Sequence, residues 1–228
     1  MRNAKTCLFL LSLVFLFKIS DAQSTTDLGA MLSAEYQQNV LRNTNISVKE
    51  ELRFDNNFSQ FARSKTSLNL DYKFPRYGFR IGGGIYYINK YTKKHIYRNR
   101  YRFVINLSYK YDYRNWKFGY RMRFQWLFYD EARGCYNYTP DFYWRNRLSV
   151  AYQRPNSRYE YSLSGEFYSL LNNDRRFDLE SVALTANVSY RLTRRQFLMF
   201  FVRDDRDIFI DDDTLRIIYF GVSWKFKQ

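Results

Sequence analysis

Arginine occupies every second position in residues 97–103, which read YRNRYRF. A planar guanidinium suits phosphate and carboxylate groups, and aromatic rings between the arginines could stack on bases. The stretch therefore fits either a groove for nucleic acid or the polar face of a strand whose other face is apolar. A secretory signal, the repetition of this pattern over many strands and the lack of a recognisable binding motif argue against nucleic acid.

His95 is the only histidine and lies beside Lys93 and Lys94. A histidine can act as a general base that activates a nucleophile for acyl transfer or hydrolysis. No serine or aspartate lies near it in the sequence, so a catalytic site would need partners brought together by folding. We therefore expect a protein that is not an enzyme and needs no cofactor. The alternative is an outer-membrane lipid hydrolase or acyltransferase that uses His95.

Two acidic runs near the C-terminus could bind a hard divalent cation, because such ions prefer carboxylate oxygens. The candidate ligands are Asp204, Asp205, Asp207, Asp211, Asp212 and Asp213. We place these residues in a long loop. Their spacing lacks the glycine turn and final glutamate of a helical calcium-binding loop, which favours a solvated acidic loop instead.

Basic residues in other expected loops could contact lipopolysaccharide phosphates through charge-assisted hydrogen bonds. They are Lys93, Lys94, Arg133, Arg175 and Arg176. Outer-membrane lipid and lipopolysaccharide are thus expected partners, and nucleic acid is not.

The first 22 residues have the pattern of a cleavable signal peptide: basic residues, a short apolar run and small residues before an expected cleavage ahead of Gln23. The apolar run is too short to cross a bilayer as a helix. Residues 23–228 would then form a single domain with one cysteine, Cys135, and no intramolecular disulfide. The chain has 37 Lys and Arg against 22 Asp and Glu, and most of this basic excess lies beyond the signal.

Polar and apolar residues alternate along nearly all of residues 23–228, which predicts β-strands. The expected strands are near 44–54, 62–74, 77–90, 96–111, 115–129, 141–153, 157–171, 179–192, 195–203 and 214–227. Most exceed the roughly five or six residues usual in globular proteins and reach the roughly nine to eleven needed to cross a bilayer at a tilt.

The connections between these strands alternate in length. Short ones fall at 75–77, 112–114, 155–157 and 193–194, and longer ones near 89–95, 130–140, 172–178 and 203–213. This is typical of a transmembrane β-barrel with short periplasmic turns and long outer loops. Counting 28–37 as a strand gives eleven, whereas single-chain bacterial barrels have even numbers, so we predict an all-β, antiparallel up-and-down barrel of about 10–12 strands.

A barrel in a bilayer has an apolar outer face and can have a polar inner face. The alternation places many charged residues on the inner face, where we expect a crowded network. Its members are Arg98, Arg100, Arg102, Arg121, Arg123, Arg145, Arg147, Glu160 and Glu166. Either these groups only satisfy one another in a structural or interaction protein, or a water path survives and basic side chains favour anions in a narrow channel.

The last residues, 218–228, form an amphipathic strand with Phe226 close to the end. This ending resembles the signature that barrel insertion machinery recognises. The segment ending at 51–54 (ELRF), the stretch 70–73 (LDYK) and the R-x-R strands at 97–103 and 120–124 also resemble a family, the uncharacterised outer-membrane barrels catalogued as domain of unknown function 2490. The resemblance implies a barrel of Gram-negative outer membranes with no established activity.

Overall fold

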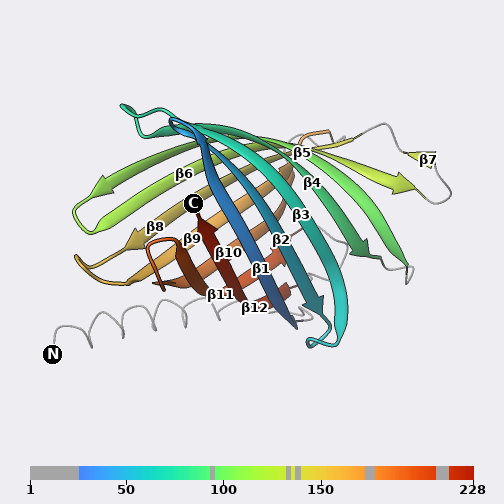
Figure 1. Cartoon of the computed structure of the whole chain (residues 1–228). Helices are drawn as coiled ribbons and strands as arrows, with labels where there is room; N and C mark the ends of the chain where they lie inside the picture. Colours follow the sequence, from blue (N-terminus) through green and yellow to red (C-terminus); the bar gives the residue numbers. More distant parts are fainter. Residues whose placement is uncertain (1–25, 93–95, 132–134, 137–139, 173–177, 209–215) are drawn as a thin grey trace.

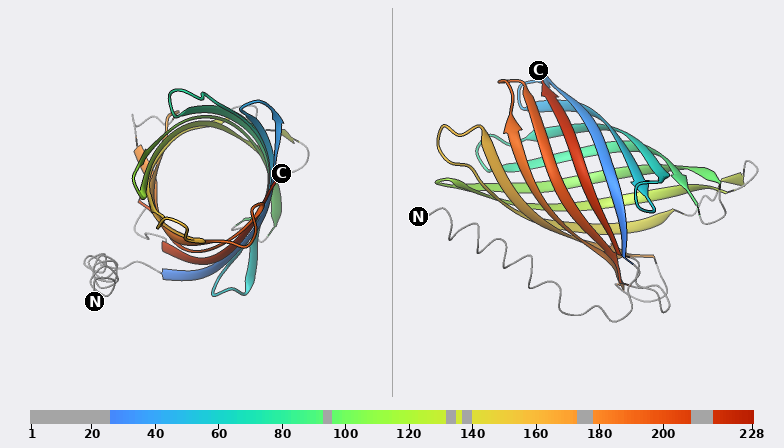
Figure 2. Two further views of the ribbon diagram at one scale, coloured as in Figure 1. Left: turned by 60° about the vertical axis from the view of Figure 1, so that its left-hand side comes forward. Right: turned by 90° about the horizontal axis from the view of Figure 1, so that it is seen from below.

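The structure is a computed structural model that describes residues 26–92, 96–131, 135–136, 140–172, 178–208 and 216–228. Within these ranges, eleven long strands close into a barrel (Figures 1 and 2). The first six are β1 (Thr26–Leu41), β2 (Thr44–Asp55), β3 (Gln60–Lys73), β4 (Phe79–Tyr91), β5 (Tyr97–Tyr113) and β6 (Trp116–Glu131). The other five are β8 (Asp141–Tyr152), β9 (Tyr159–Leu170), β10 (Asp178–Arg191), β11 (Gln196–Asp207) and β12 (Arg216–Lys227).

The short strand β7 (Cys135–Tyr136) pairs only with the end of β6 and is not part of the barrel wall. Each of the eleven wall strands bonds to its neighbours in the sequence, and β1 bonds to β12 to close the ring. The predicted barrel of about ten to twelve strands is confirmed.

The closing pair differs from the rest of the wall because β1 and β12 run parallel. Neighbouring strands alternate in direction, so an odd number of strands must bring the first and last together in the same direction. The register pairs Ser33 with Ser223 and Glu35 with Lys225, and the two serine hydroxyls lie 2.8 Å apart. The fully antiparallel wall that we expected therefore has one parallel seam.

One end of the barrel carries only short turns, at 42–43, 74–78, 114–115, 153–158 and 192–195. Several of them contain residues with positive φ, such as Asn43 at 67° and Arg114 at 53°. Gly78 has a φ of 68°, and an added Cβ would lie 2.5 Å from the Lys110 carbonyl oxygen, so this turn requires glycine. The short connections predicted at 75–77, 112–114, 155–157 and 193–194 fall in or beside these turns.

The long connections lie at the other end, and one of our predictions about them was wrong. Residues 203–207 belong to β11, not to the last loop. All five pair with β10, and residues 203–206 also pair with β12. Their charges suggested a solvated loop, but a barrel strand can carry charges on its inner face and near its ends.

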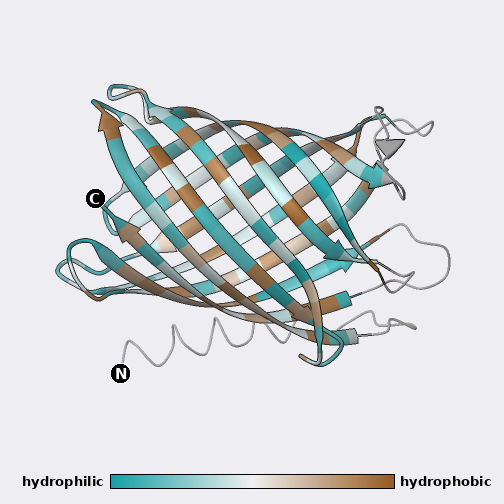
Figure 3. Ribbon diagram, turned by 45° about the vertical axis from the view of Figure 1, so that its right-hand side comes forward, coloured by the Kyte–Doolittle hydropathy of each residue, from teal (hydrophilic) through white to brown (hydrophobic). Residues whose placement is uncertain are grey.

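The two faces of the wall differ in the way expected for a barrel in a membrane. Outer side chains are large and apolar, for example Leu148 and Phe200, and exposed. Polar side chains such as Glu51, Gln125 and Glu166 are buried inside. Figure 3 shows this alternation as hydrophobic and hydrophilic bands along each strand.

Aromatic pairs lie near both ends of the outer face, as in the girdles of membrane barrels. At the short-turn end, the ring centroids of Trp116 and Tyr152 are 4.9 Å apart. At the other end, the ring centroids of Tyr91 and Tyr97 are 5.0 Å apart. The described part of the chain contains no helix long and apolar enough to span a membrane.

Candidate functional site: the charged lumen

Glu51 on β2 is buried inside the barrel and is surrounded by basic side chains. Lys65 Nζ lies 2.8 Å from its Oε2, and Arg53 Nε donates a hydrogen bond of 3.0 Å to its Oε1. Arg63 and Lys49 lie farther away, at 3.7 and 3.9 Å. Alternation along β2 and β3 brings these residues to the same face, because β2 pairs Glu51 with Lys65 and Arg53 with Arg63.

Glu166 on β9 forms a second cluster of the same kind. Arg121 Nη2 lies 2.6 Å from its Oε1, and Arg145 Nη2 lies 3.0 Å from its Oε2. Arg203 approaches the same carboxylate to 3.9 Å, and the Tyr168 hydroxyl donates a hydrogen bond of 2.9 Å to it. Four strands, β6, β8, β9 and β11, thus converge on one buried carboxylate.

Asp205 on β11 joins the two clusters. It accepts a hydrogen bond of 2.7 Å from Arg203 Nε and one of 3.4 Å from Arg53 Nη1. We call the connected set the lumen belt. Its carboxylates are Glu51, Glu166 and Asp205, and its cations are Lys49, Arg53, Arg63, Lys65, Arg121, Arg145, Arg147 and Arg203. The belt therefore has more positive than negative groups.

The predicted network residues have different surroundings. The structure brings Arg121, Arg145 and Glu166 together, and Arg147 donates a hydrogen bond of 3.0 Å to Ser164 Oγ beside them. Arg123 instead donates to Asn106 Oδ1.

The other predicted network residues lie outside the belt. Glu160 pairs with Lys117 near the short-turn end, where both side chains are partly exposed. Arg98, Arg100 and Arg102 point inward from β5 but have no carboxylate within 4.0 Å among the described residues.

Six of the eleven belt residues were not among the predicted site residues. Sequence reasoning missed Lys49, Glu51, Arg53, Arg63, Lys65 and Arg203, and it had placed Asp205 only among the candidate metal ligands. The signal was present, because Lys49, Glu51 and Arg53 alternate along β2 in the same way as the arginines of β5.

The acidic residues of the expected last loop are placed in two ways. Asp204 and Asp205 are adjacent in β11, so their side chains face opposite sides of the wall. Asp204 faces outward, and Arg206 Nη2 and Arg216 Nε each lie 3.0 Å from its carboxylate. Asp207 lies at the end of the same strand. The parts of the chain that the structure describes hold no group of three candidate metal ligands. Asp211, Asp212 and Asp213 lie outside the described residues, so metal binding stays a prediction.

The remaining candidates also lie outside the described residues. They are His95, Lys93, Lys94, Arg133, Arg175 and Arg176. The hydrolase alternative and the lipopolysaccharide contacts therefore stay predictions.

Basic residues also dominate the short-turn end of the barrel. Each of the five turns contains arginine, and none contains aspartate or glutamate. The arginines are Arg42, Arg76, Arg114, Arg154, Arg158, Arg194 and Arg195. A polar cleft of about 380 Å³ lies at this end, lined in part by Arg114, Lys117, Arg154 and Arg191.

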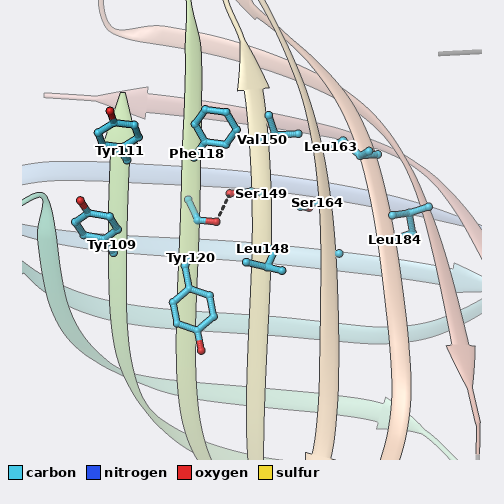
Figure 4. A pocket seen from close by; sticks show the side chains of 12 residues that line it. Tyr109, Tyr111, Phe118, Tyr120, Leu148, Ser149, Val150, Leu163, Ser164 and Leu184 are labelled. Carbon is cyan, nitrogen blue, oxygen red and sulfur yellow. Dashed lines mark hydrogen bonds between the residues drawn. The ribbon is translucent and has the colours of Figure 1, made fainter. Parts of the chain in front are cut away.

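A second hollow, of about 420 Å³, lies on the outer face and not in the lumen (Figure 4). Outward side chains such as Tyr120, Leu148 and Leu184 line it, and it forms where Gly165 has no side chain. Its lining is apolar, as suits a surface that faces lipid.

Comparisons with known proteins agree with the barrel. Among solved structures, the chain is similar to the porin NanC, with 15% identity, a TM-score of 0.53 and coverage of 89% of this chain and 99% of that one. An anion-selective porin from Comamonas acidovorans is less similar, with 10% identity, a TM-score of 0.38 and coverage of 84% and 54%. No curated protein matches the chain. The model of a family described as "protein of unknown function (DUF2490)" matches residues 29–207, and the chain belongs to this family.

Proposed function

We propose that this protein is a narrow, anion-favouring channel of a bacterial outer membrane. The supporting observation is the lumen belt, in which three carboxylates face eight cations across the interior of the barrel. Rings of basic side chains favour anions over cations in a water-filled pore. The proposal assigns no catalytic role to the protein.

The width of the pore follows from the number of strands and from the belt. Interior diameter grows with strand number, from about eight strands, where side chains fill the interior, to about sixteen, where a wide channel remains. Eleven strands lie between these limits. The link between Arg53 and Asp205 takes up part of this space, which supports a narrow path.

The short-turn end supports the same charge preference. Its turns carry seven arginines and no carboxylate, so this mouth would have a positive potential. A charged entrance raises the local concentration of ions of opposite sign. Both the mouth and the belt would therefore draw anions into the pore.

Chloride release from vesicles tests the proposal. The folded protein would be reconstituted into vesicles loaded with KCl, and chloride efflux would be followed in the presence of a potassium carrier. We expect rapid efflux from these vesicles and none from vesicles made with heat-unfolded protein. If the folded protein released no chloride, the channel proposal would be wrong and a structural or interaction role would remain.

A further inference from the structure

Five basic residues on β3, β4 and β5 form an inward-facing surface that shares Arg63 with the lumen belt. We call it the cationic wall and define it as Arg63, Lys90, Arg98, Arg100 and Arg102. The register places Arg63, Lys90 and Arg98 in one row across the three strands. Arg100 and Arg102 follow on β5, opposite Ile88 and Tyr86.

The cationic wall has few negative partners at close range, although Asp55, Asp207 and Glu180 attract Lys90 or Arg102 without forming an ion pair. Among the described residues, its only carboxylate within 4.0 Å is Glu51, at 3.7 Å from Arg63 Nη2, and Glu51 is already paired with Lys65 and Arg53. The positive charges of the wall also repel one another. Arg63 and Arg102 repel each other, and Lys90 is repelled by both Arg63 and Arg100. A group of like charges held this closely is unfavourable unless an anion neutralises it.

Three of these arginines have buried polar atoms that are not satisfied. The Nε atoms of Arg63, Arg100 and Arg102 are buried and have no hydrogen-bond partner. Arg102 is the extreme case, because no hydrogen bond, ion pair or ring contact joins it to any described residue. Its neighbour Arg123, by contrast, hydrogen bonds to Asn106 and lies over the Tyr86 ring. A buried Nε–H donor without an acceptor is costly, and Arg102 as a whole is only partly buried, so its Nη donors are open to a partner from the lumen.

Arg100 and Arg102 are register partners of Ile88 and Tyr86, which belong to a buried apolar cluster. Tyr86, Ile88 and Val104 form a buried cluster on the inner face of β4 and β5, and Ile88 is only 1% exposed. Arg100 also lies over the Tyr129 ring, 4.7 Å from its centroid. Arginine stems that lie on packed apolar groups keep their charged ends in one region, so the donors need little reorganisation to bind.

We propose that the cationic wall binds a small oxoanion, with Arg102 as the central ligand and Arg63 and Arg100 beside it. The forked guanidinium donates two parallel hydrogen bonds to phosphate or carboxylate, and this geometry separates such groups from chloride. The inference deepens the proposed channel function and rests on it for access, because the site faces the lumen. It names the solute class: small phosphates or carboxylates.

Binding to the folded barrel in a zwitterionic detergent tests the inference without requiring conduction. Calorimetric titration with inorganic phosphate, and separately with acetate, would be carried out at constant ionic strength in chloride buffer. We expect saturable binding of at least one of the two, weakened at least about tenfold by Arg102→Gln. Arg102→Lys keeps the charge but loses the fork, so it should also weaken binding.

Arg206→Gln is the matched control, because Arg206 pairs with Asp204 on the outer side of the wall. It should leave the dissociation constant unchanged. A shift in gel mobility between boiled and unboiled samples would show that each variant is folded. Absence of saturable binding by the wild type, or equal binding by the Arg102 and Arg206 variants, would overturn the inference.

The two proposals fail in different ways. If chloride efflux occurred without oxoanion binding, the binding-site proposal would be wrong and the channel proposal would stand. If binding depended on Arg102 but no efflux occurred, the binding site would be supported and the channel proposal would be wrong.

Discussion

Arg53 Nη1 on β2 lies 3.4 Å from Asp205 Oδ2 on β11, although β1 and β12 separate these strands in the wall. The contact crosses the inside of the barrel. It connects Glu51, through Arg53, to Asp205, and Asp205 connects through Arg203 to Glu166. The two buried glutamates therefore belong to one network, and the network spans strands from the beginning and the end of the chain.

Removing the charge of Glu166 should destabilise the barrel strongly. Glu166→Gln leaves Arg121 and Arg145 without their carboxylate in a buried site, and breaking such a pair costs about 3–5 kcal/mol. Glu160→Gln on the same strand is the control. Its pair with Lys117 is partly exposed and should contribute less than about 1 kcal/mol. Urea unfolding in lipid vesicles measures the free energy of unfolding of both variants. Equal losses of stability in the two variants would contradict the buried cluster around Glu166.

Gly29 should not tolerate a side chain. An added Cβ would lie 2.6 Å from both the Phe54 carbonyl oxygen and the Tyr219 ring, over which Arg53 is held. Gly29→Ala should therefore lower the free energy of unfolding by about 1–3 kcal/mol. At Gly165, nothing lies within 4 Å of an added Cβ, so Gly165→Ala should have little effect or stabilise slightly. The same unfolding assay compares the two, and a greater loss for Gly165→Ala would contradict this packing.

A disulfide should form across the parallel seam in the register that the structure shows. Ser33 and Ser223 are register partners whose hydroxyls lie 2.8 Å apart, so Ser33→Cys with Ser223→Cys should cross-link on oxidation in a Cys135→Ser background. The cross-link joins both ends of the chain and would change the mobility of the unfolded protein on a non-reducing gel. Ser33→Cys with Val222→Cys is the control, because Val222 faces the other side of β12. Cross-linking only in the control pair would mean that the register is wrong.

The arginines of the short-turn end should affect ion selectivity only at low salt. Neutralising Arg114, Arg154 and Arg191, which line the polar cleft, should lower the chloride-to-potassium permeability ratio in about 0.1 M KCl. In about 1 M KCl, where the screening length falls from about 10 Å to about 3 Å, the triple variant should match the wild type. Bilayer recordings at both concentrations measure the ratio. A difference that persists at high salt would place these arginines inside the narrow part of the pore.

The strands and the faces of the barrel were predictable because alternation with a period of two is a local property. It assigned Arg145 and Glu166 to the lumen without any knowledge of their neighbours. Their partners were less predictable, since Arg53 and Asp205 are 152 residues apart and meet only when the barrel closes in one register. Residues 203–207 were assigned to a loop because charged runs usually lie in solvent, whereas here they end a strand.

The central claim, that the lumen belt favours anions, is tested most directly by the zero-current potential of the wild-type protein across a KCl gradient in a planar bilayer. If chloride crosses more readily than potassium, the dilute side becomes negative, and this is the result that we predict. A dilute side that becomes positive would show cation selectivity and would contradict the role assigned to Arg53, Arg145 and the other cations of the belt.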